Sequence, residues 1–420
     1  MTELGQELKN EVLRTIDLSR DLEDRELLDM IDRTLALRSK ETYLGIGERL
    51  RLRKEIFNSI RRLDILQELI EDPHITEIMI NGASHIFIEK AGRIEEWERG
   101  FESDKKLFDI IQQIASGANR VINETSPIVD ARLYDGSRVN IVLPPVSLVG
   151  PVVTIRKFPE KPMTMERLIS LGSISEEAAE FLKELVESGY NIFISGGTGA
   201  GKTTFLNALT GYIPSTERII TIEDSAELQI VSIPNLVRLE VRNANVEGKN
   251  EITIRDLIKS SLRMRPDRII VGEVRDAAAI DMLQGLNTGH SGLSTGHANS
   301  ARDMLSRLET MVLLGSDIPI TAVRRQIASA IDLIIHLGRL RDRSRRVLEI
   351  TEVLECVDGE IELNPLFAFR EEGEAEDGTV IGSLKRTGNN LLHVGKLARA
   401  KGTGREQLIR RGEGEKHECG

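Results

Sequence analysis

Gly196-Gly197-Thr198-Gly199-Ala200-Gly201-Lys202-Thr203, followed by Thr204, is the stretch of this chain that decides its fold. It matches the phosphate-binding loop pattern, in which glycines let the backbone wrap around phosphates, the lysine supplies a positive charge and the threonine hydroxyl binds Mg²⁺. An apolar strand over 192–194 precedes the loop and a helix-forming stretch over 205–209 follows it. The N-terminus of such a helix favours an anion. The sequence therefore predicts that residues 196–204 bind ATP, with Thr203 on Mg²⁺, rather than forming a glycine-rich turn without a ligand.

Acidic residues follow two further predicted strands of the same segment. Strands and helices alternate over 163–345, which is typical of a parallel sheet covered on both faces, and ligands of such sheets lie at the carboxyl ends of the strands. The strands predicted over 218–222 and 268–271 end beside Glu223 and Glu273. We expect these two acids to handle water and magnesium. Because a glycine replaces the usual aspartate before Glu273, we expect that residue to contact the metal through a water. Taken singly, each acid could also be a surface residue at the start of a loop.

Two histidines occur in a near-repeat, Thr288-Gly289-His290 and Thr295-Gly296-His297, around a short predicted strand. Histidines at strand edges can contact a phosphate or a neighbouring acid, which makes His290 and His297 candidate nucleotide-binding residues. A metal site is the weaker interpretation, because no third ligand is near in the sequence. Ordinary hydrogen-bonded loop histidines are the other alternative.

Three arginines, Arg132, Arg138 and Arg156, lie near predicted strands before the loop. Guanidinium groups suit the negative charge that builds up during phosphoryl transfer. Their spacing alone does not separate this role from that of exposed surface arginines.

The chain divides into five segments by its pattern. Short strands, turn signals such as Asn81-Gly82 and one predicted helix make the second segment a small α/β domain, and two prolines mark the linker that follows it. Strands continue briefly after residue 345, and glycine and charge dominate the end of the chain. The expected segments are 1–60, helical and suited to docking or oligomerisation; 61–158, the α/β domain; 159–162, a hinge; 163–370, an α/β motor domain; and 371–420, a charged tail.

Composition limits the classes of protein that fit. The formal net charge is -11 and aromatic residues make up 4% of the 420 residues, whereas nucleic-acid binders usually carry a basic surplus and stacking aromatics. The two cysteines, Cys356 and Cys419, form no C-x-x-C pair, so a four-cysteine zinc site is excluded. The N-terminus does not read as a signal peptide, and the most apolar run, 141–153, contains three prolines. We expect a cytoplasmic protein that binds no nucleic acid and reaches a membrane only peripherally.

Six motifs in order give the chain a resemblance to the secretion ATPases of type II and type IV systems, and most closely to the ATPases of Tad (Flp) pilus assembly. The resemblance covers about residues 69–355. The motifs are Asp72–Gly82, Asp130–Asn140, the P-loop, Thr221–Leu228, which resembles the family's Asp box, Arg263–Asp276, which resembles its Walker B segment, and Thr288–Ser300, which resembles its His box.

The resemblance implies a RecA-like motor hinged to the preceding α/β domain, and a homo-hexameric ring at the inner face of the cytoplasmic membrane, held there by inner-membrane platform proteins. It implies ATP and Mg²⁺ as ligands, Glu223 as general base and Glu273 as the magnesium partner. It also implies that the three arginines sense phosphate and that both histidines belong to a nucleotide-responsive loop. Because the chain lacks the four-cysteine zinc insertion of many type II motors, the Tad or type IV branch is favoured.

Two other functions remain open from the sequence. A RecA-like nucleic-acid translocase would share the motor fold, although the acidic charge and scarce aromatics speak against it. A small-molecule kinase would share the P-loop, but it would have no use for the Asp-box and His-box pairing and would need no ring. The size of the particle with nucleotide bound separates the ring-forming classes from the kinase.

Overall fold

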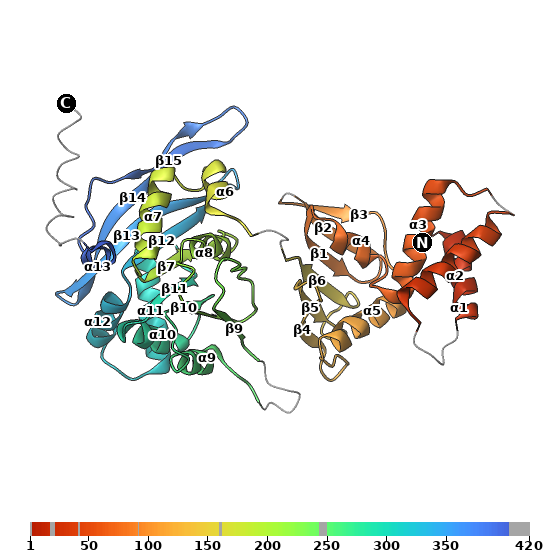
Figure 1. Ribbon diagram of the computed structural model, residues 1–420, viewed down its shortest axis with the longest axis horizontal. Helices are drawn as coiled ribbons and strands as arrows, with labels where there is room; N and C mark the ends of the chain where they lie inside the picture. Colours follow the sequence, from red (N-terminus) through yellow and green to blue (C-terminus); the bar gives the residue numbers. More distant parts are fainter. Residues whose placement is uncertain are drawn as a thin grey trace. The chain divides into compact units, whose positions relative to one another are not determined.

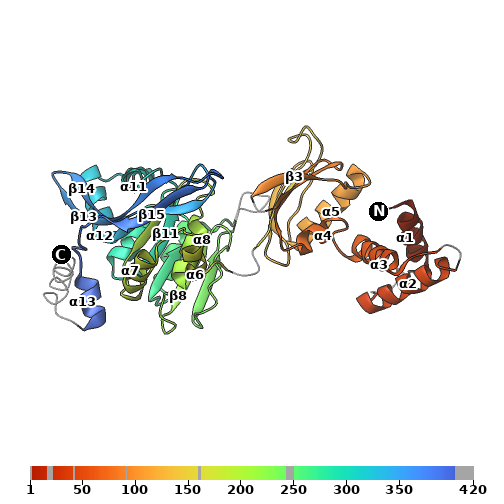
Figure 2. The same ribbon diagram turned by 90° about the horizontal axis from the view of Figure 1, so that it is seen from above.

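The computed structural model describes residues 2–16, 22–40, 43–90, 92–158, 162–242 and 250–402. These residues form two compact units, Met1–Glu160 and Lys161–Gly420 (Figures 1 and 2). The boundary between the units falls within the expected hinge, of which residues 159–161 lie outside the described residues. Within the described ranges, no helix combines the length and the apolar character needed to cross a membrane.

The first unit begins with three helices, α1 (Glu3–Thr15), α2 (Asp24–Arg38) and α3 (Ile46–Arg61). Thr2 caps α1 by accepting a hydrogen bond from the Gly5 backbone N–H, which satisfies one of the exposed donors at a helix start. The apolar stripes of the three helices meet in one small core. Its fully buried members include Leu8, Val12, Leu27, Ile31, Leu35, Leu52 and Ile56. The prediction of helices in this segment is confirmed.

A six-stranded antiparallel sheet forms the rest of the first unit. After α4 (Leu66–Glu71), its strands are β1 (Ile75–Asn81), β2 (His85–Lys90), β3 (Arg93–Trp97), β4 (Ile128–Arg132), β5 (Arg138–Val142) and β6 (Val152–Arg156). Their spatial order is β3-β2-β1-β6-β5-β4. Buried and exposed residues alternate along β5 and β6, as in a sheet with one covered face. Helix α5 (Asp104–Gly117) contributes its apolar residues to the same core.

The second unit is built on a nine-stranded sheet with the order β15-β14-β13-β12-β7-β11-β10-β8-β9. The six strands from β12 to β9 are mutually parallel, and β13 to β15 are antiparallel. The parallel strands are β7 (Ile192–Gly196), β8 (Ile219–Glu223), β9 (Leu236–Glu240), β10 (Arg268–Val271), β11 (Ser291–Gly296) and β12 (Leu333–Arg339). The central strands are buried throughout, as expected when helices cover both faces.

Two helical layers enclose this sheet (Figures 1 and 2). Helices α7 (Glu176–Glu187) and α8 (Lys202–Thr210) share one apolar core, and α10 (Ala278–Asn287), α11 (Ala301–Gly315) and α12 (Ile320–Ala330) share the other. Two short helices, α6 (Met165–Ser170) and α9 (Ile254–Ser261), pack beside them. This three-layer arrangement is the RecA-like motor fold that the sequence predicted.

The prediction that short strands end at residue 370 and a tail follows is wrong. β13 (Arg345–Val357) and β14 (Glu360–Glu374) are long, and β15 (Val380–Arg386) pairs with β14 at the edge of the motor sheet. Val380 and Leu384 are buried on one face of β15. The burial of these two side chains favours a strand, although the charge and glycine content of the segment suggested a tail. Helix α13 (Gly395–Lys401) follows, and residues 403–420 lie outside the described residues.

Candidate nucleotide site

The predicted phosphate-binding loop lies between β7 and α8. Its glycines serve specific backbone needs, because Gly199 and Gly201 have φ values of 71° and 92°, which residues with a side chain rarely adopt. A Cβ atom on Gly196 would come within 2.6 Å of the Leu337 carbonyl oxygen. A Cβ atom on Gly197 or Gly199 would instead project into open space. The loop therefore leaves room for a phosphate group against its backbone.

Lys202 is the first residue of α8, and its side chain folds back over the loop. The ammonium Nζ donates to the carbonyl oxygens of Gly196 and Gly197, both at 3.1 Å. It also lies 3.2 Å from His297 Nδ1. Lysine has only donors, so Nδ1 of His297 accepts and its other ring nitrogen carries the proton.

His297 connects the loop to the acid at the end of β10. Its Nε2 lies 3.0 Å from Glu273 Oε1, and Arg275 Nη2 donates to Glu273 Oε2 at 2.8 Å. Arg275 Nη1 lies 3.6 Å from Asp224, which follows β8. One chain of contacts thus joins Lys202, His297, Glu273, Arg275 and Asp224, which come from four separate motifs. Arg275 was not predicted as a site residue, although its position two residues after Glu273 was a usable signal.

The charges of this network shift its pKa values. Burial acts to raise the pKa of Glu273, but the hydrogen bond and charge of Arg275, with the charges of His297 and Lys202, outweigh burial and lower it. Burial lowers the pKa of His297, helped by the charge of Lys202. Burial also lowers the pKa of Lys202, although Glu273 opposes the change. His297 is therefore neutral and Glu273 ionised at neutral pH.

Glu223, the last residue of β8, is 3% exposed. Its Oε2 accepts hydrogen bonds from the backbone N–H groups of Glu227 at 2.7 Å and Leu228 at 2.9 Å. Its Oε1 is buried and has no hydrogen-bond partner among the described residues. Burial raises the pKa of this carboxyl, and the two N–H bonds only partly oppose it. A fixed carboxylate with one unused oxygen and a raised pKa suits a general base.

The same edge of the sheet holds these groups, because β8, β10 and β11 are parallel to β7 and all four strands therefore end at that edge. Half-buried Thr203, in the first turn of α8, is placed there as well. Over the described ranges, no cluster of three or more His, Cys, Asp or Glu side chains could hold a metal ion. Mg²⁺ in nucleotide sites needs no such cluster, since one or two protein oxygens, water and substrate phosphates complete its shell. The residues present fit that chemistry.

His290 does not join this group within its unit. It precedes β11, whereas His297 follows it, and the P-loop lies at the end where β11 finishes. His290 Nδ1 lies 3.2 Å from the Gly285 carbonyl oxygen and 3.3 Å from Thr288 Oγ1. These local contacts correspond to the loop-histidine alternative.

Arg132, Arg138 and Arg156 come together in the first unit. Arg132 pairs with Arg138 across β4 and β5, and Arg138 pairs with Arg156 across β5 and β6. The three residues therefore form a row on the polar face of the sheet.

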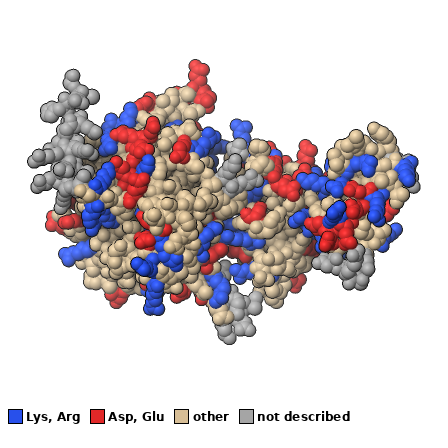
Figure 3. All heavy atoms as spheres, in the orientation of Figure 1, with Lys and Arg blue, Asp and Glu red and all other residues tan. Residues whose placement is uncertain are grey.

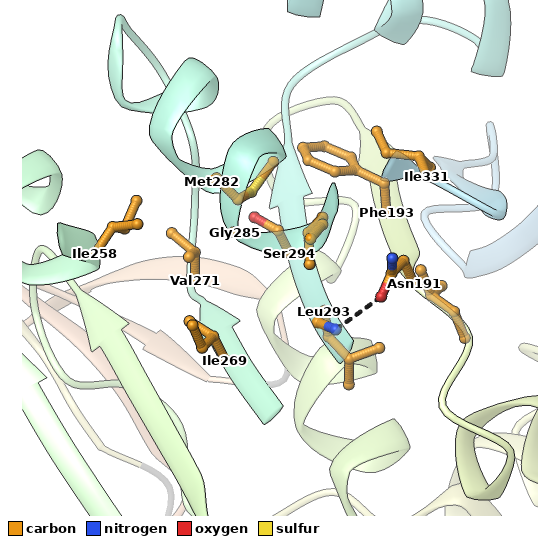
Figure 4. Close-up of a pocket in the computed structure, with 13 residues that line it drawn as sticks. Asn191, Phe193, Ile258, Ile269, Val271, Met282, Gly285, Leu293, Ser294 and Ile331 are labelled. Atoms are coloured by element: carbon orange, nitrogen blue, oxygen red, sulfur yellow. Dashed lines mark hydrogen bonds between the residues drawn. The ribbon is translucent and has the colours of Figure 1, made fainter. Parts of the chain in front are cut away.

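A small internal cavity lies elsewhere in the second unit (Figure 4). Its volume is about 20 Å³, and apolar side chains such as Phe193, Val271 and Met282 form most of its lining. The Asn191 side chain at its edge accepts a hydrogen bond from the Gly292 N–H. The cavity has room for about one water molecule, so it is no nucleotide pocket.

Neither positive nor negative side chains dominate the face of the molecule shown in Figure 3. Lysine and arginine side chains are mixed with aspartate and glutamate over both units in that view. This mixture agrees with the modest net charge of the chain.

The fold and the loop define a P-loop ATPase with a RecA-like motor. Comparison with protein families then identifies the kind of ATPase, because the family described as "Type II/IV secretion system protein" matches residues 61–377. The chain belongs to this family, and it is an ATPase of the secretion type.

Individual relatives agree with this assignment. The chain is 33% identical over 295 residues to the conjugal transfer protein TrbB of Rhizobium radiobacter, covering 69% of this chain and 87% of that protein. It is 31% identical over 335 residues to the type IV secretion system protein VirB11 of Bartonella henselae, covering 70% and 92%. The crystal structure of the pilus retraction motor PilT with bound ADP aligns with a TM-score of 0.50 and 20% identity over 83% of this chain and 88% of that one. At this identity the structural likeness shows the fold alone.

Proposed function

We propose that this chain is the ATP-hydrolysing motor of a Tad/Flp-type pilus assembly or protein secretion machine, and that it works as a homo-hexamer. The observation that carries the proposal is the contact chain from Lys202 through His297 to Glu273 and Arg275. It joins the P-loop to the segments that resemble the Walker B and His-box motifs of secretion ATPases. A simple phosphate-binding turn has no use for such a chain.

The geometry of the two acids supports a separate role for each. A water beside the γ-phosphate attacks phosphorus, the bond to the bridging oxygen of ADP breaks, and Glu223 Oε1 accepts the proton of the water. The fixed Oε2 keeps the carboxylate in place during this step. Mg²⁺, when bound, would neutralise charge on the phosphate oxygens, and Thr203 and, through a water, Glu273 are the residues that would hold it.

The arginine row supplies the link to motion. The γ-phosphate carries most of the charge that distinguishes ATP from ADP, and Arg132, Arg138 and Arg156 form a cationic row on the other unit. We propose that the row closes onto the triphosphate of the same chain about a hinge at 159–162 and opens after hydrolysis, as in other hinge closures. The arginines then also stabilise transition-state charge.

The proposal includes a place in the cell. The motor would lie on the inner face of the cytoplasmic membrane, held there by inner-membrane platform proteins. The translocase alternative shares the motor fold, but the net charge of -11 disfavours it.

The test is the size of the purified chain with Mg²⁺ and a non-hydrolysable ATP analogue, measured by sedimentation, together with ATPase rates with and without DNA. A hexamer whose ATPase rate does not respond to DNA supports the motor. A monomer contradicts the ring, and strong stimulation by DNA favours the translocase. Pilin and prepilin-peptidase genes beside this gene would support pilus assembly over other export.

A further inference from the structure

A run of arginines lies in the hairpin that connects β12 to β13. β12 pairs in parallel with β7, and Leu337 stands opposite Gly196, the first residue of the phosphate-binding loop. β12 ends two residues later, at Arg339. The hairpin therefore begins at the same sheet edge as the loop and directly beside it. Its arginines are Arg339, Arg341, Arg343, Arg345 and Arg346.

Arg345 contacts the loop directly. Its Nε donates to the Gly199 carbonyl oxygen at 2.8 Å. Its Cδ atom would lie 3.4 Å from a Cβ atom on Gly201, so the aliphatic part of the side chain crosses the start of α8. Within the described part of the chain, Nη1 and Nη2 of Arg345 have no hydrogen-bond or ion-pair partner. The guanidinium is thus anchored at one nitrogen and has two others available for a ligand.

Arg339 stands directly opposite Arg345 in the strand register. Both side chains are exposed, and neither contacts a carboxylate among the residues that the structure describes. The neighbouring Arg341 differs, because it forms ion pairs with Glu371 and Glu374 at 2.7 and 2.8 Å. Two like charges directly opposite each other destabilise a strand pair. A ligand with an anionic or π-rich group would relieve this repulsion.

The sheet order indicates which part of a nucleotide reaches these arginines. Glu223 ends β8 and Glu273 follows β10, and both strands lie on one side of β7, whereas β12 and β13 lie on the other. The γ-phosphate has to meet the acids for hydrolysis. The nucleoside end of the same molecule is then directed away from the acids, toward β12 and β13.

We propose that Arg345, supported by Arg339, binds the nucleoside end of the nucleotide. The planar guanidinium of Arg345 stacks on the adenine ring or bonds to the ribose, while its Nε holds the tip of the phosphate-binding loop. Arginine suits this role because it combines stacking with several donors in one plane. The inference rests on the proposed nucleotide site, and it adds a subsite that the loop motif does not contain.

The test compares two ligands, MgADP and magnesium pyrophosphate, by isothermal titration to the full chain and to its Arg345→Ala variant. Pyrophosphate has the phosphate groups of ADP but no nucleoside. Arg345→Ala is expected to weaken the binding of MgADP about 10-fold, which is the scale of the contribution of a stacked cation in a partly desolvated site. The same substitution is expected to weaken the binding of magnesium pyrophosphate less than about 2-fold. Arg339→Ala should show a smaller loss with the same selectivity.

Arg343→Asn is the matched control. It removes one positive charge from the same hairpin, and asparagine tolerates the φ of 68° at this position. The control should bind both ligands as the wild type does. If Arg345→Ala weakened the binding of both ligands equally, the side chain would act through general electrostatics or through the position of the loop, and the nucleoside subsite would be overturned. Unchanged binding of both ligands would also overturn it. A wild type that binds neither ligand would refute the nucleotide site itself and this subsite with it.

Discussion

Replacing Glu223 by glutamine should have opposite effects on activity and stability. Glutamine keeps the shape of the side chain, and its amide oxygen can still accept the N–H bonds of Glu227 and Leu228. It cannot accept a proton from the attacking water. ATP turnover should therefore fall at least about 100-fold, the scale of a lost general base, while MgATP binding persists.

The stability of the second unit should rise at neutral pH. Burial raises the pKa of Glu223 above its ordinary value of 4.5, so the folded chain holds this proton more tightly than the unfolded chain does. The ionised carboxylate then costs stability above the folded-state pKa, and the cost disappears as the pH falls to 4.5. A buried polar atom without a partner costs about 1–3 kcal/mol. Because the glutamine amide also lacks a partner there, we expect a gain near 1 kcal/mol, or about 2–4 °C in the melting temperature of a unit this size.

The assay pairs steady-state ATPase rates with thermal melts at pH 8 and pH 5, using Glu362→Gln as the control. Glu362 is an exposed glutamate on β14, so its amide variant should match the wild type in both measurements. The Glu223→Gln advantage in melting temperature should shrink from pH 8 to pH 5. Wild-type turnover would refute the role as base. A variant less stable than wild type at pH 8 would refute the inference that the ionised carboxylate destabilises the folded state.

Three further predictions use the same rate assay. Lys202→Ala should abolish turnover with its melting temperature nearly unchanged, because within the described ranges Nζ bonds only to the loop and His297. Wild-type turnover would exclude this loop as the ATP site. Glu273→Gln should raise the Mg²⁺ concentration for half-maximal activity about 10-fold, as for other residues that support a metal, and an unchanged Mg²⁺ requirement would remove it from the metal site. Arg156→Ala should bind ATP nearly normally yet lose turnover. If the arginines serve the nucleotide of their own chain, mixing Arg156→Ala with Lys202→Ala subunits should restore no activity. Recovered activity would show that the arginines serve the nucleotide of a neighbouring subunit.

Local sequence patterns predicted four parallel strands of the motor sheet, β7, β8, β10 and β11, because they are short apolar runs that end in or beside glycines or acids. The end of β14 and the whole of β15 were missed for a physical reason. They form an edge that is exposed on much of its length, so their sequence is charged and resembles a tail. The alternation around Val380 and Leu384 was the signal that could have identified β15.

The site residues show where sequence spacing fails. The near-repeat suggested that His290 and His297 act together, but six residues of β11 separate them. A strand rises about 3.3 Å per residue, so the two histidines lie about 20 Å apart, at the two ends of β11. Conversely, Arg132 and Arg156 are distant in sequence yet lie in one row, because β5 pairs with both β4 and β6. Pairing partners and register depend on the whole sheet and cannot be read from spacing alone.

The contact chain at the loop explains how one phosphate could affect several segments at once. Lys202 has three donors, and its contacts with two loop carbonyls and His297 already use them. In the proposed mechanism, a phosphate would compete for the same ammonium and change the partner of His297, and the contacts of Glu273 and Arg275 would carry this change to Asp224. Glu223 is outside this chain, because the backbone N–H groups of the Asp-box segment hold it. In the mechanism that we propose, the site separates a fixed base from a set of exchangeable charges, which would let a motor change conformation without losing the geometry of its chemistry.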